Sequence, residues 1–223
     1  MNTKIKSITK ACSINDEIFS LIVKNLRNKI LKTESDINKF IRKEARKRKL
    51  KISFPPVVAI GKNAAKIHHK PKKRKLKKGF LVMDFGVKVN GYCSDMTRTI
   101  YIGKPSKKEK DIYDRVLQAQ KTGIKKARIG AECFEIDYAV RKNLKGLREK
   151  FVHSLGHGVG KKIHELPNLS PKTDYLLKKG DVITIEPGVY IKGKLGIRIE
   201  DSILIDKRIK ILTRSTKKLI IIK

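Results

Sequence analysis

The chain has 223 residues, which is enough for one domain or two small ones with a proper buried core. Its 55 Lys and Arg residues outnumber its 21 Asp and Glu residues, so the net charge of +34 excludes an acidic protein and is compatible with an anionic partner. The apolar runs are too short for a transmembrane helix or a signal peptide, and three cysteines are too few for a disulfide framework, so we expect a cytoplasmic protein outside the membrane.

Two helices are predicted ahead of the first strand. Apolar residues recur at helical spacing between Ser13, a candidate N-cap, and Leu31, which indicates an amphipathic helix. A second helix is expected from about Glu34 to Arg48, and the Phe-Pro-Pro sequence at residues 54–56 breaks it. A short apolar strand then leads into an exposed basic loop.

That loop and the end of the second helix hold the densest basic runs of the chain, Arg42–Lys51 and Lys70–Lys78. Neither run contains an aromatic residue, so a base-stacking platform is not indicated. Two interpretations of the charge are open. A Lys-rich proteome would give it as background, which the spread of basic residues along the chain favours. A functional role would be weak electrostatic binding to nucleic acid.

The residues from Gly79 to Gly103 predict a β-hairpin. Asn90-Gly91 separates two apolar runs, and both residues accept the positive φ angles of a type I′ turn. Such a turn would pair Asp84 with Thr97, and it would place Asp84 and Asp95 on one face as diagonal neighbours, with roughly 7–8 Å between their Cα atoms. Two inward-facing carboxylates at this distance need a cation or a raised pKa.

Two more helices are predicted in the middle of the chain. Ser106 and Glu109 form a capping-box pattern at the start of a helix that would run to about Arg128. The next helix would span about residues 133–148. The first of these helices would stop at Gly130.

The rest of the chain is predicted as strands and loops. The Gly-rich segment 151–160 is expected to be strand-like at its start, and Pro167 and Pro171 are expected to bound an extended loop. Strands are predicted over residues 181–186 and 196–205, with a turn between them.

The second strand pair echoes the first hairpin. In both halves Lys-Lys-Gly precedes an apolar run that ends in an acidic residue, Asp84 or Glu186, and a second acidic residue follows on the returning strand, Asp95 or Glu200. Carboxylates in apolar strands are rarely buried without a partner, so a shared cation is expected. With His157, which lies between two glycines, the set suffices for two adjacent divalent ions, and its oxygen-rich character suits Mn, Co, Fe or Zn.

Four motifs that carry these residues resemble the ordered motifs of the pita-bread metallopeptidase family, which includes methionine aminopeptidases, Xaa-Pro aminopeptidases and prolidases. They are MDFGVKVNGYCSDMTRT, HSLGHGVGKKIHELP, TIEPGVYI and GIRIED, and the similarity extends over about residues 7–212. The resemblance implies an α+β pita-bread fold, in which helices cover the outer face of a pseudo-twofold antiparallel β-sheet. It also implies two divalent metal ions as cofactors, with Mn or Co favoured over Fe or Zn.

The resemblance implies a role for each residue of the metal site. Asp84 would hold one ion, Asp95 and Glu200 would bridge both, and His157 and Glu186 would complete the ligand shells. Glu186 would also be the general base for a metal-bridging hydroxide that attacks the peptide bond.

Further residues are expected in the site by the same resemblance. His68 would contact the substrate near the scissile bond, His164 would stabilise the tetrahedral intermediate, and His153 would line the site. Arg198 alternates with the last metal-ligating glutamate, so it would also point to the centre, where it would pair with a carboxylate or bind a substrate C-terminus with support from Tyr190. The expected catalytic residues are His68, His153, His164 and Glu186, and the expected substrate-binding residues are His68, His153, Tyr190 and Arg198.

The motifs favour the Xaa-Pro branch of the family. Methionine aminopeptidases usually differ after the Glu-Pro pair and lack the arginine before the last glutamate. The length predicts a single catalytic domain over residues 1–223, without the N-terminal creatinase-type domain of the usual Xaa-Pro enzymes. We therefore expect a hydrolase of the Xaa-Pro aminopeptidase or prolidase kind, acting on peptides. Methionine removal, a non-catalytic nucleic-acid- or ribosome-binding role, and homodimer formation are open alternatives.

Overall fold

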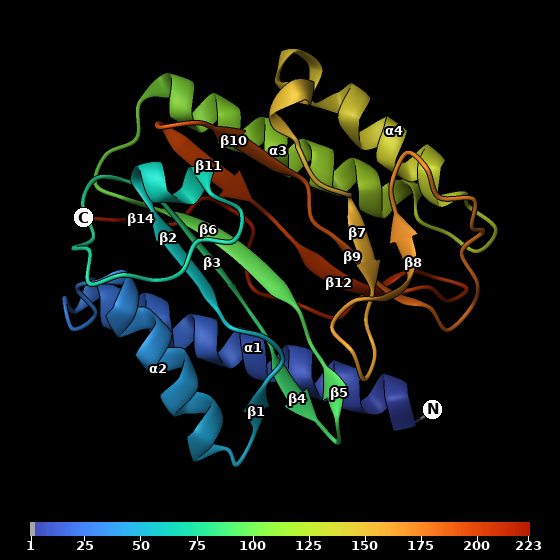
Figure 1. Cartoon of the computed structure of the whole chain (residues 1–223), viewed down its shortest axis with the longest axis horizontal. Helices are drawn as coiled ribbons and strands as arrows, with labels where there is room; N and C mark the ends of the chain where they lie inside the picture. Colours follow the sequence, from blue (N-terminus) through green and yellow to red (C-terminus); the bar gives the residue numbers. More distant parts are fainter. Residues whose placement is uncertain (1–2) are drawn as a thin grey trace.

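The computed structural model describes residues 3–223, in which two pairs of helices pack against antiparallel strands (Figure 1). The helices are α1 (Thr3–Arg27), α2 (Glu34–Lys47), α3 (Lys107–Lys126) and α4 (Cys133–Asn143), with 3-10 turns η1 (Gly61–Ala65) and η2 (Lys145–Lys150). The strands are β1 (Lys51–Ile52), β2 (Val57–Ile60), β3 (Gly79–Phe85), β4 (Val87–Val89), β5 (Tyr92–Cys93), β6 (Met96–Ile102), β7 (Gly156–Gly158), β8 (Glu165–Leu169), β9 (Val182–Ile185), β10 (Gly188–Ile191), β11 (Leu195–Arg198), β12 (Asp201–Leu204), β13 (Lys210–Ile211) and β14 (Ile221–Ile222).

The first helix is longer than predicted. It begins at Thr3, and Ser13 lies inside it, so the predicted N-cap is wrong. The apolar period continues upstream of Ser13, where Ile8 and Cys12 are fully buried. The second helix begins where expected, because Thr33 and Asp36 form a reciprocal capping box at its N-terminus.

The predicted hairpin is confirmed in its register. Asp84 on β3 lies opposite Thr97 on β6, and the turn residues Asn90 and Gly91 have φ angles of 50° and 79°. A type I′ turn needs positive φ at both positions, which Asn and Gly adopt most readily. Asp95 lies just before β6, two residues from Thr97, which is opposite Asp84. Asp95 therefore shares the face of Asp84, because side chains two residues apart on a strand point to the same side.

The second half repeats this arrangement with two differences from the prediction. The expected strand over residues 196–205 is divided into β11 and β12, and the break falls at Ile199 and Glu200. An unpredicted strand, β10, forms a hairpin with β11, while β9 pairs with β12. The order β9-β10-β11-β12 thus matches β3-β4-β5-β6, as a pseudo-twofold fold requires.

Two smaller predictions around the second half are wrong. Pro167 lies within strand β8 rather than in a loop, and the Gly-rich segment forms its strand, β7, at residues 156–158 rather than at its start. The predicted capping box at Ser106 is confirmed, although α3 ends at Lys126, and α4 ends at Asn143 with a 3-10 turn after it.

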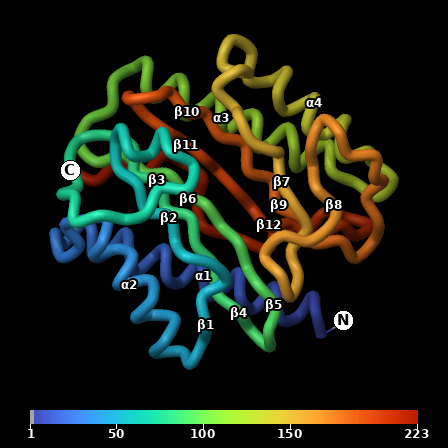
Figure 2. Tube along the Cα trace, viewed as in Figure 1, coloured from blue at the N-terminus to red at the C-terminus, as the bar shows by residue number. Residues whose placement is uncertain are grey.

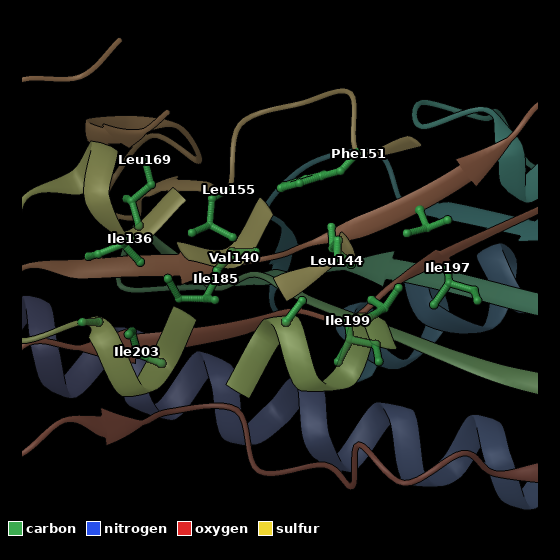
Figure 3. Packing of buried hydrophobic residues seen from close by; sticks show 14 of the residues in the cluster. Ile136, Val140, Leu144, Phe151, Leu155, Leu169, Ile185, Ile197, Ile199 and Ile203 are labelled. Carbon is green, nitrogen blue, oxygen red and sulfur yellow. The ribbon is translucent and has the colours of Figure 1, made fainter. Parts of the chain in front are cut away.

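The strands form two larger sheets with orders β14-β6-β3-β2 and β13-β12-β9-β7-β8, and two smaller ones, β1-β4-β5 and β10-β11. Pairing is antiparallel except between β14 and β6. Helices α1 and α2, blue in Figure 1, bury Ile22 and Ile37 against β2, β3 and β6, while α3 and α4 cover the strands of the second half. Figure 3 shows Ile136, Val140 and Ile185 in this second core. Within residues 3–223, none of the helices combines the length and apolarity needed to cross a membrane.

Candidate metal centre and substrate cleft

The predicted ligand residues meet where the two hairpins face each other. Asp84 lies near the end of β3 and Asp95 just before β6, while Glu186 follows β9 and Glu200 precedes β12. The two halves are joined directly here, because the Glu200 N–H donates to the Thr97 carbonyl at 3.1 Å. Each half therefore supplies two carboxylates to one centre.

Strand β7 brings an imidazole to these carboxylates. Ligand atoms of Asp95, His157 and Glu200 all lie within 4.8 Å of one another. His157 Nε2 is 3.5 Å from Asp95 Oδ2 and 3.4 Å from Glu186 Oε1. Because Nδ1 donates to the Gly158 carbonyl at 3.0 Å, the Nε2 lone pair faces the carboxylates, an arrangement that is repulsive without a cation and suits metal ligation.

The glycines on either side of His157 are required by this packing. A Cβ atom at Gly156 would lie 2.0 Å from the Thr184 carbonyl oxygen, and one at Gly158 would lie 2.3 Å from the Leu166 carbonyl oxygen. Only a residue without a side chain lets β7 come this close to β9 and β8. This close approach of the three strands fixes where the imidazole lies.

The carboxylates of the centre are buried without enough partners. Asp84 Oδ1, Asp95 Oδ1 and Glu200 Oε1 are buried and receive no hydrogen bond from any residue in 3–223. Burial and the neighbouring acids hold the pKa values of Asp95 and Glu200 well above their usual range, and burial raises the pKa of Glu186 to about 8. Burial lowers the pKa of His157 to about 4, so the imidazole is neutral at pH 7. An oxygen-rich set with one neutral imidazole fits divalent cations.

Two threonines that were not predicted donate hydrogen bonds to carboxylates of the centre. Thr97 Oγ1 donates to Glu200 Oε2 at 2.7 Å, and Thr184 Oγ1 donates to Glu186 Oε1 at 3.2 Å. Each threonine lies two residues from a predicted ligand, Asp95 or Glu186, and therefore on the same strand face. This alternation is the signal by which the sequence could have revealed them.

Arg198 points to the centre as predicted, and it pairs with a carboxylate of the site. Its Nη2 donates to Asp84 Oδ2 at 2.5 Å, and its Nε donates to Thr97 Oγ1 at 3.0 Å. Its Nη1 donates to the Tyr190 hydroxyl at 2.9 Å, so Tyr190 supports it as expected. Arg198 is 3% exposed, so of the two predicted roles the structure has the pairing with a ligand carboxylate.

Tyr190 links Arg198 to the first of the predicted histidines. His153 Nδ1 donates to the Ser154 carbonyl at 2.8 Å, which leaves Nε2 to accept from the Tyr190 hydroxyl at 2.9 Å. Burial, followed by the positive charge of Arg198, lowers the pKa of His153 to about 3. This imidazole is therefore a neutral, fixed part of the wall.

The centre opens into a cleft of about 1080 Å³. Its lining includes residues 67–71 and 163–166. Figure 2 shows the backbone of these two stretches, teal after β2 and orange leading into β8, on opposite sides of the central strands. His68 lines one side, and His153 and His164 line the other; the rings of His164 and His157 are 4.3 Å apart. The structure thus brings all the predicted histidines to one cleft. Apolar lining residues that were not predicted include Phe54, Pro55, Ile67, Ile163 and Leu166.

The loop that carries His68 is less exposed than expected. His69 is 6% exposed and turns away from solvent, where it contacts Glu34. Only the first of the two adjacent histidines is exposed.

The chain is similar to known proteins over almost all of its length. A model of metallopeptidase family M24 matches residues 6–207. An Xaa-Pro dipeptidase from Pyrococcus furiosus is 42% identical over 174 residues, which cover 76% of this chain and 50% of the relative. The chain spans between 45% and 59% of the length of the first three curated relatives.

Solved structures share the fold. A prolidase from Thermococcus sibiricus has a TM-score of 0.93 and 38% identity, covering 98% of this chain and 60% of that chain. An X-Pro aminopeptidase from Thermotoga maritima has a TM-score of 0.91 and 33% identity, covering 98% of this chain and 63% of that chain. The pita-bread fold predicted from the motifs is confirmed.

Proposed function

Because the chain belongs to metallopeptidase family M24, we propose that it is a metal-dependent peptidase that removes the N-terminal residue of peptides, with proline preferred in the second position. The observation that carries this proposal is the cluster of Asp95, His157 and Glu200, whose unpaired carboxylate oxygens line an open cleft. The Xaa-Pro names of the relatives support the preference for proline.

Five residues would hold two divalent metal ions, with Mn or Co favoured over Fe or Zn: Asp84, Asp95, His157, Glu186 and Glu200. Four carboxylates and a single imidazole, without a thiolate, favour such ions over a structural zinc. The bound ions would activate water and stabilise negative charge on the substrate.

Glu186 is suited to move the proton of the reaction. Its carboxylate lines the cleft, and the Thr184 hydroxyl fixes Oε1. Glu186 accepts the proton of the attacking water and returns it to the leaving amine, which is the work of a general base followed by that of a general acid.

The three histidines of the cleft contact the substrate. His164 donates to the oxygen that becomes negative during attack, His68 contacts the peptide beside the scissile bond from the other side, and neutral His153 lines the site. Tyr190 and Arg198 hold His153 and Asp84 in place, so they act on the substrate through these partners.

Peptide hydrolysis tests the proposal. The purified protein is stripped of metal, reloaded with Mn or Co, and given an Xaa-Pro dipeptide, an Xaa-Pro tripeptide and a Met-Ala peptide, with Glu186→Gln as the control. We expect cleavage of the proline peptides, and the dipeptide-to-tripeptide ratio separates prolidase from aminopeptidase activity. Cleavage of the Met-Ala peptide alone would assign methionine removal, and no cleavage with either metal would refute the proposal.

A second function, electrostatic binding to nucleic acid, is favoured by the placement of the basic runs. Residues 42–51 and 70–78, here called the basic face, include fourteen Lys or Arg residues among 19, and Glu44 is their single acidic residue. The second run is tied to the start of α2, the helix that carries much of the first run, because the Ser35 N–H donates to the Lys72 carbonyl at 3.0 Å and the Glu34 N–H to the Arg74 carbonyl at 3.2 Å. Arg42 of the first run and Lys70 of the second both line the cleft. Without aromatic residues, this face would bind phosphates and not bases.

The basic face is tested by fluorescence anisotropy with a single-stranded RNA at about 50 and 200 mM salt. We expect affinity to fall steeply with salt and to fall further when Lys72, Lys73 and Lys75 are all changed to Gln. The matched control changes three exposed lysines of α3, Lys107, Lys108 and Lys110, to Gln. Equal losses of RNA affinity in the two triple variants would show that binding depends on the overall charge and not on the basic face.

A further inference from the structure

A buried carboxylate outside the metal centre holds the loop that carries His68. Glu34, the first residue of α2, is 0% exposed. Its Oε1 accepts from the Ile60 N–H at 2.9 Å and from Asn63 Nδ2 at 2.8 Å. Its Oε2 accepts from His69 Nε2 at 2.9 Å and from the Lys72 N–H at 3.0 Å. Burial alone would raise the pKa of Glu34, but these four donors lower it on balance.

The four donors all come from one short stretch of chain. Residues 60–72 run from the end of β2 through η1 into the loop, and Glu34 contacts this stretch at four points along its length. The start of α2 is also tied to the loop by its own backbone, through the N–H groups of Glu34 and Ser35. The loop is therefore fastened to a helix rather than free in solvent, which reduces the conformations open to it.

His68 lies inside the fastened stretch, next to one of the four donors. The ring of His69 points back to Glu34, while His68 is exposed and lines the cleft. The two adjacent histidines thus have different tasks, one as an anchor and one in the cleft.

We propose that Glu34 and His69 are positioning residues for His68 and hold its imidazole where it meets the peptide beside the scissile bond. This inference rests on the proposed peptidase function. A misplacement of about 1 Å in a group that contacts the substrate can cost about a hundredfold in rate, so a rigid anchor behind the loop matters for turnover. Glu34 touches neither the substrate nor the ligand cluster, and it acts through His68.

The bonding pattern defines a sharp set of variants. Glu34→Gln has the same shape, but it places an NH₂ donor against two N–H donors, so one side of the anchor becomes repulsive. His69→Gln keeps an N–H near the position of Nε2, whereas His69→Leu removes the donor and leaves Oε2 with one partner. Ile41→Val, a fully buried change on the same helix, is the control for loss of stability alone.

Kinetics test the inference in the metal-loaded enzyme, at a temperature well below the melting point of each variant. We expect Glu34→Gln and His69→Leu each to lower kcat about 10- to 100-fold, with KM and Mn affinity little changed, while His69→Gln and Ile41→Val stay within about threefold of wild type. In a His68→Ala background, Glu34→Gln should cause no further loss. If Glu34→Gln multiplies the His68→Ala defect by its full factor, Glu34 does not act through His68.

A second readout does not depend on peptide cleavage. The chain has five histidines, so their imidazole NMR signals can be assigned by single substitution. We expect Glu34→Gln to shift and broaden the signals of His68 while those of His157 and His164 stay in place. Unchanged His68 signals would overturn the inference, and an inactive wild type with the expected NMR change would refute the proposed function alone.

Discussion

Glu200 and Asp201 are neighbours in the chain and both are buried, yet their carboxylates have opposite surroundings. Asp201 accepts from Arg98 Nη2 at 2.7 Å and also from Lys217. Burial would raise the pKa of Asp201, but these two cations outweigh it and lower that pKa. Among residues 3–223, the carboxylate of Glu200 has a single donor, the Thr97 hydroxyl, and its pKa lies well above the usual range because of burial and the other acids of the centre.

The difference separates two uses of a buried acid. Asp201 and Glu34 have their hydrogen-bond partners within the fold, so loss of either carboxylate would leave buried donors without an acceptor. Asp95 and Glu200 have carboxylate oxygens without partners in the described chain, so protonation or a cation from outside would have to compensate them. The missing partners, more than the burial, distinguish a binding site from a structural ion pair.

The largest expected effect is on catalysis. Glu186→Gln keeps the shape of the side chain and removes its ability to accept a proton, so kcat for an Xaa-Pro peptide should fall about 10³-fold. The assay is single-substrate hydrolysis with Mn, and circular dichroism checks that the fold is intact. A fall of less than about tenfold would show that Glu186 is not the base.

The two classes of acid should respond in opposite ways to loss of charge. In metal-free protein, Asp201→Asn leaves Arg98 without its buried counter-charge and should lower the free energy of unfolding by about 3–5 kcal/mol. Asp95→Asn removes an uncompensated charge and should leave that free energy unchanged or higher. Urea unfolding of both variants in excess chelator measures this difference. A similar destabilisation by both variants would contradict the distinction between the two classes of acid.

The same contrast predicts a pH dependence of the metal-free protein. Glu186 has a pKa of about 8 in the folded state against an ordinary value of 4.5, so between these values the folded state holds a proton that the unfolded state has lost. The free energy of unfolding therefore falls as the pH rises towards 8. His153 and His157 have lowered pKa values, so their titration makes the free energy of unfolding rise with pH only up to about their ordinary pKa of 6.5. Between pH 6.5 and 8 the free energy of unfolding should therefore fall, by about 1–2 kcal/mol. Urea unfolding across this range tests it, and a flat or rising profile would contradict the raised carboxylate pKa values.

The smallest effect concerns the hydroxyl that orients Glu200. Thr97→Val keeps the shape and removes the donor to Glu200 Oε2, so Mn affinity should fall about tenfold. Thr97→Ser retains the hydroxyl and serves as the matched control. Calorimetric titration compares the two, and equal affinities would mean that Thr97 does not orient this carboxylate.

The sequence predicted the centre better than it predicted the elements around it. Asn90-Gly91 set the register that places Asp84 and Asp95 on one face, because turn type and strand alternation are local properties. Ser13 has the chemistry of an N-cap, but it lies inside helix α1, because apolar residues continue at helical spacing upstream of it. The interruption between strands β11 and β12 at Glu200 could not be predicted, because an apolar run does not show where a strand bends.

Partnerships between distant residues could not be predicted in this way. The donors to Glu34 lie 26 to 38 residues further along the chain, and Arg98 and Asp201 are 103 residues apart. Their sequence contexts do not tell a compensated acid such as Asp201 from an uncompensated one such as Glu200. Only the fold shows which carboxylates have partners.

Calorimetric titration of the metal-stripped protein with Mn²⁺ tests the central claim most directly. The surroundings of Asp95, Glu186 and Glu200 predict saturable binding of two ions per chain with release of protons, and they predict that Asp95→Asn abolishes at least one site while Asp201→Asn retains both in the folded protein. Absence of saturable binding, or binding that Asp95→Asn leaves unchanged, would contradict the account.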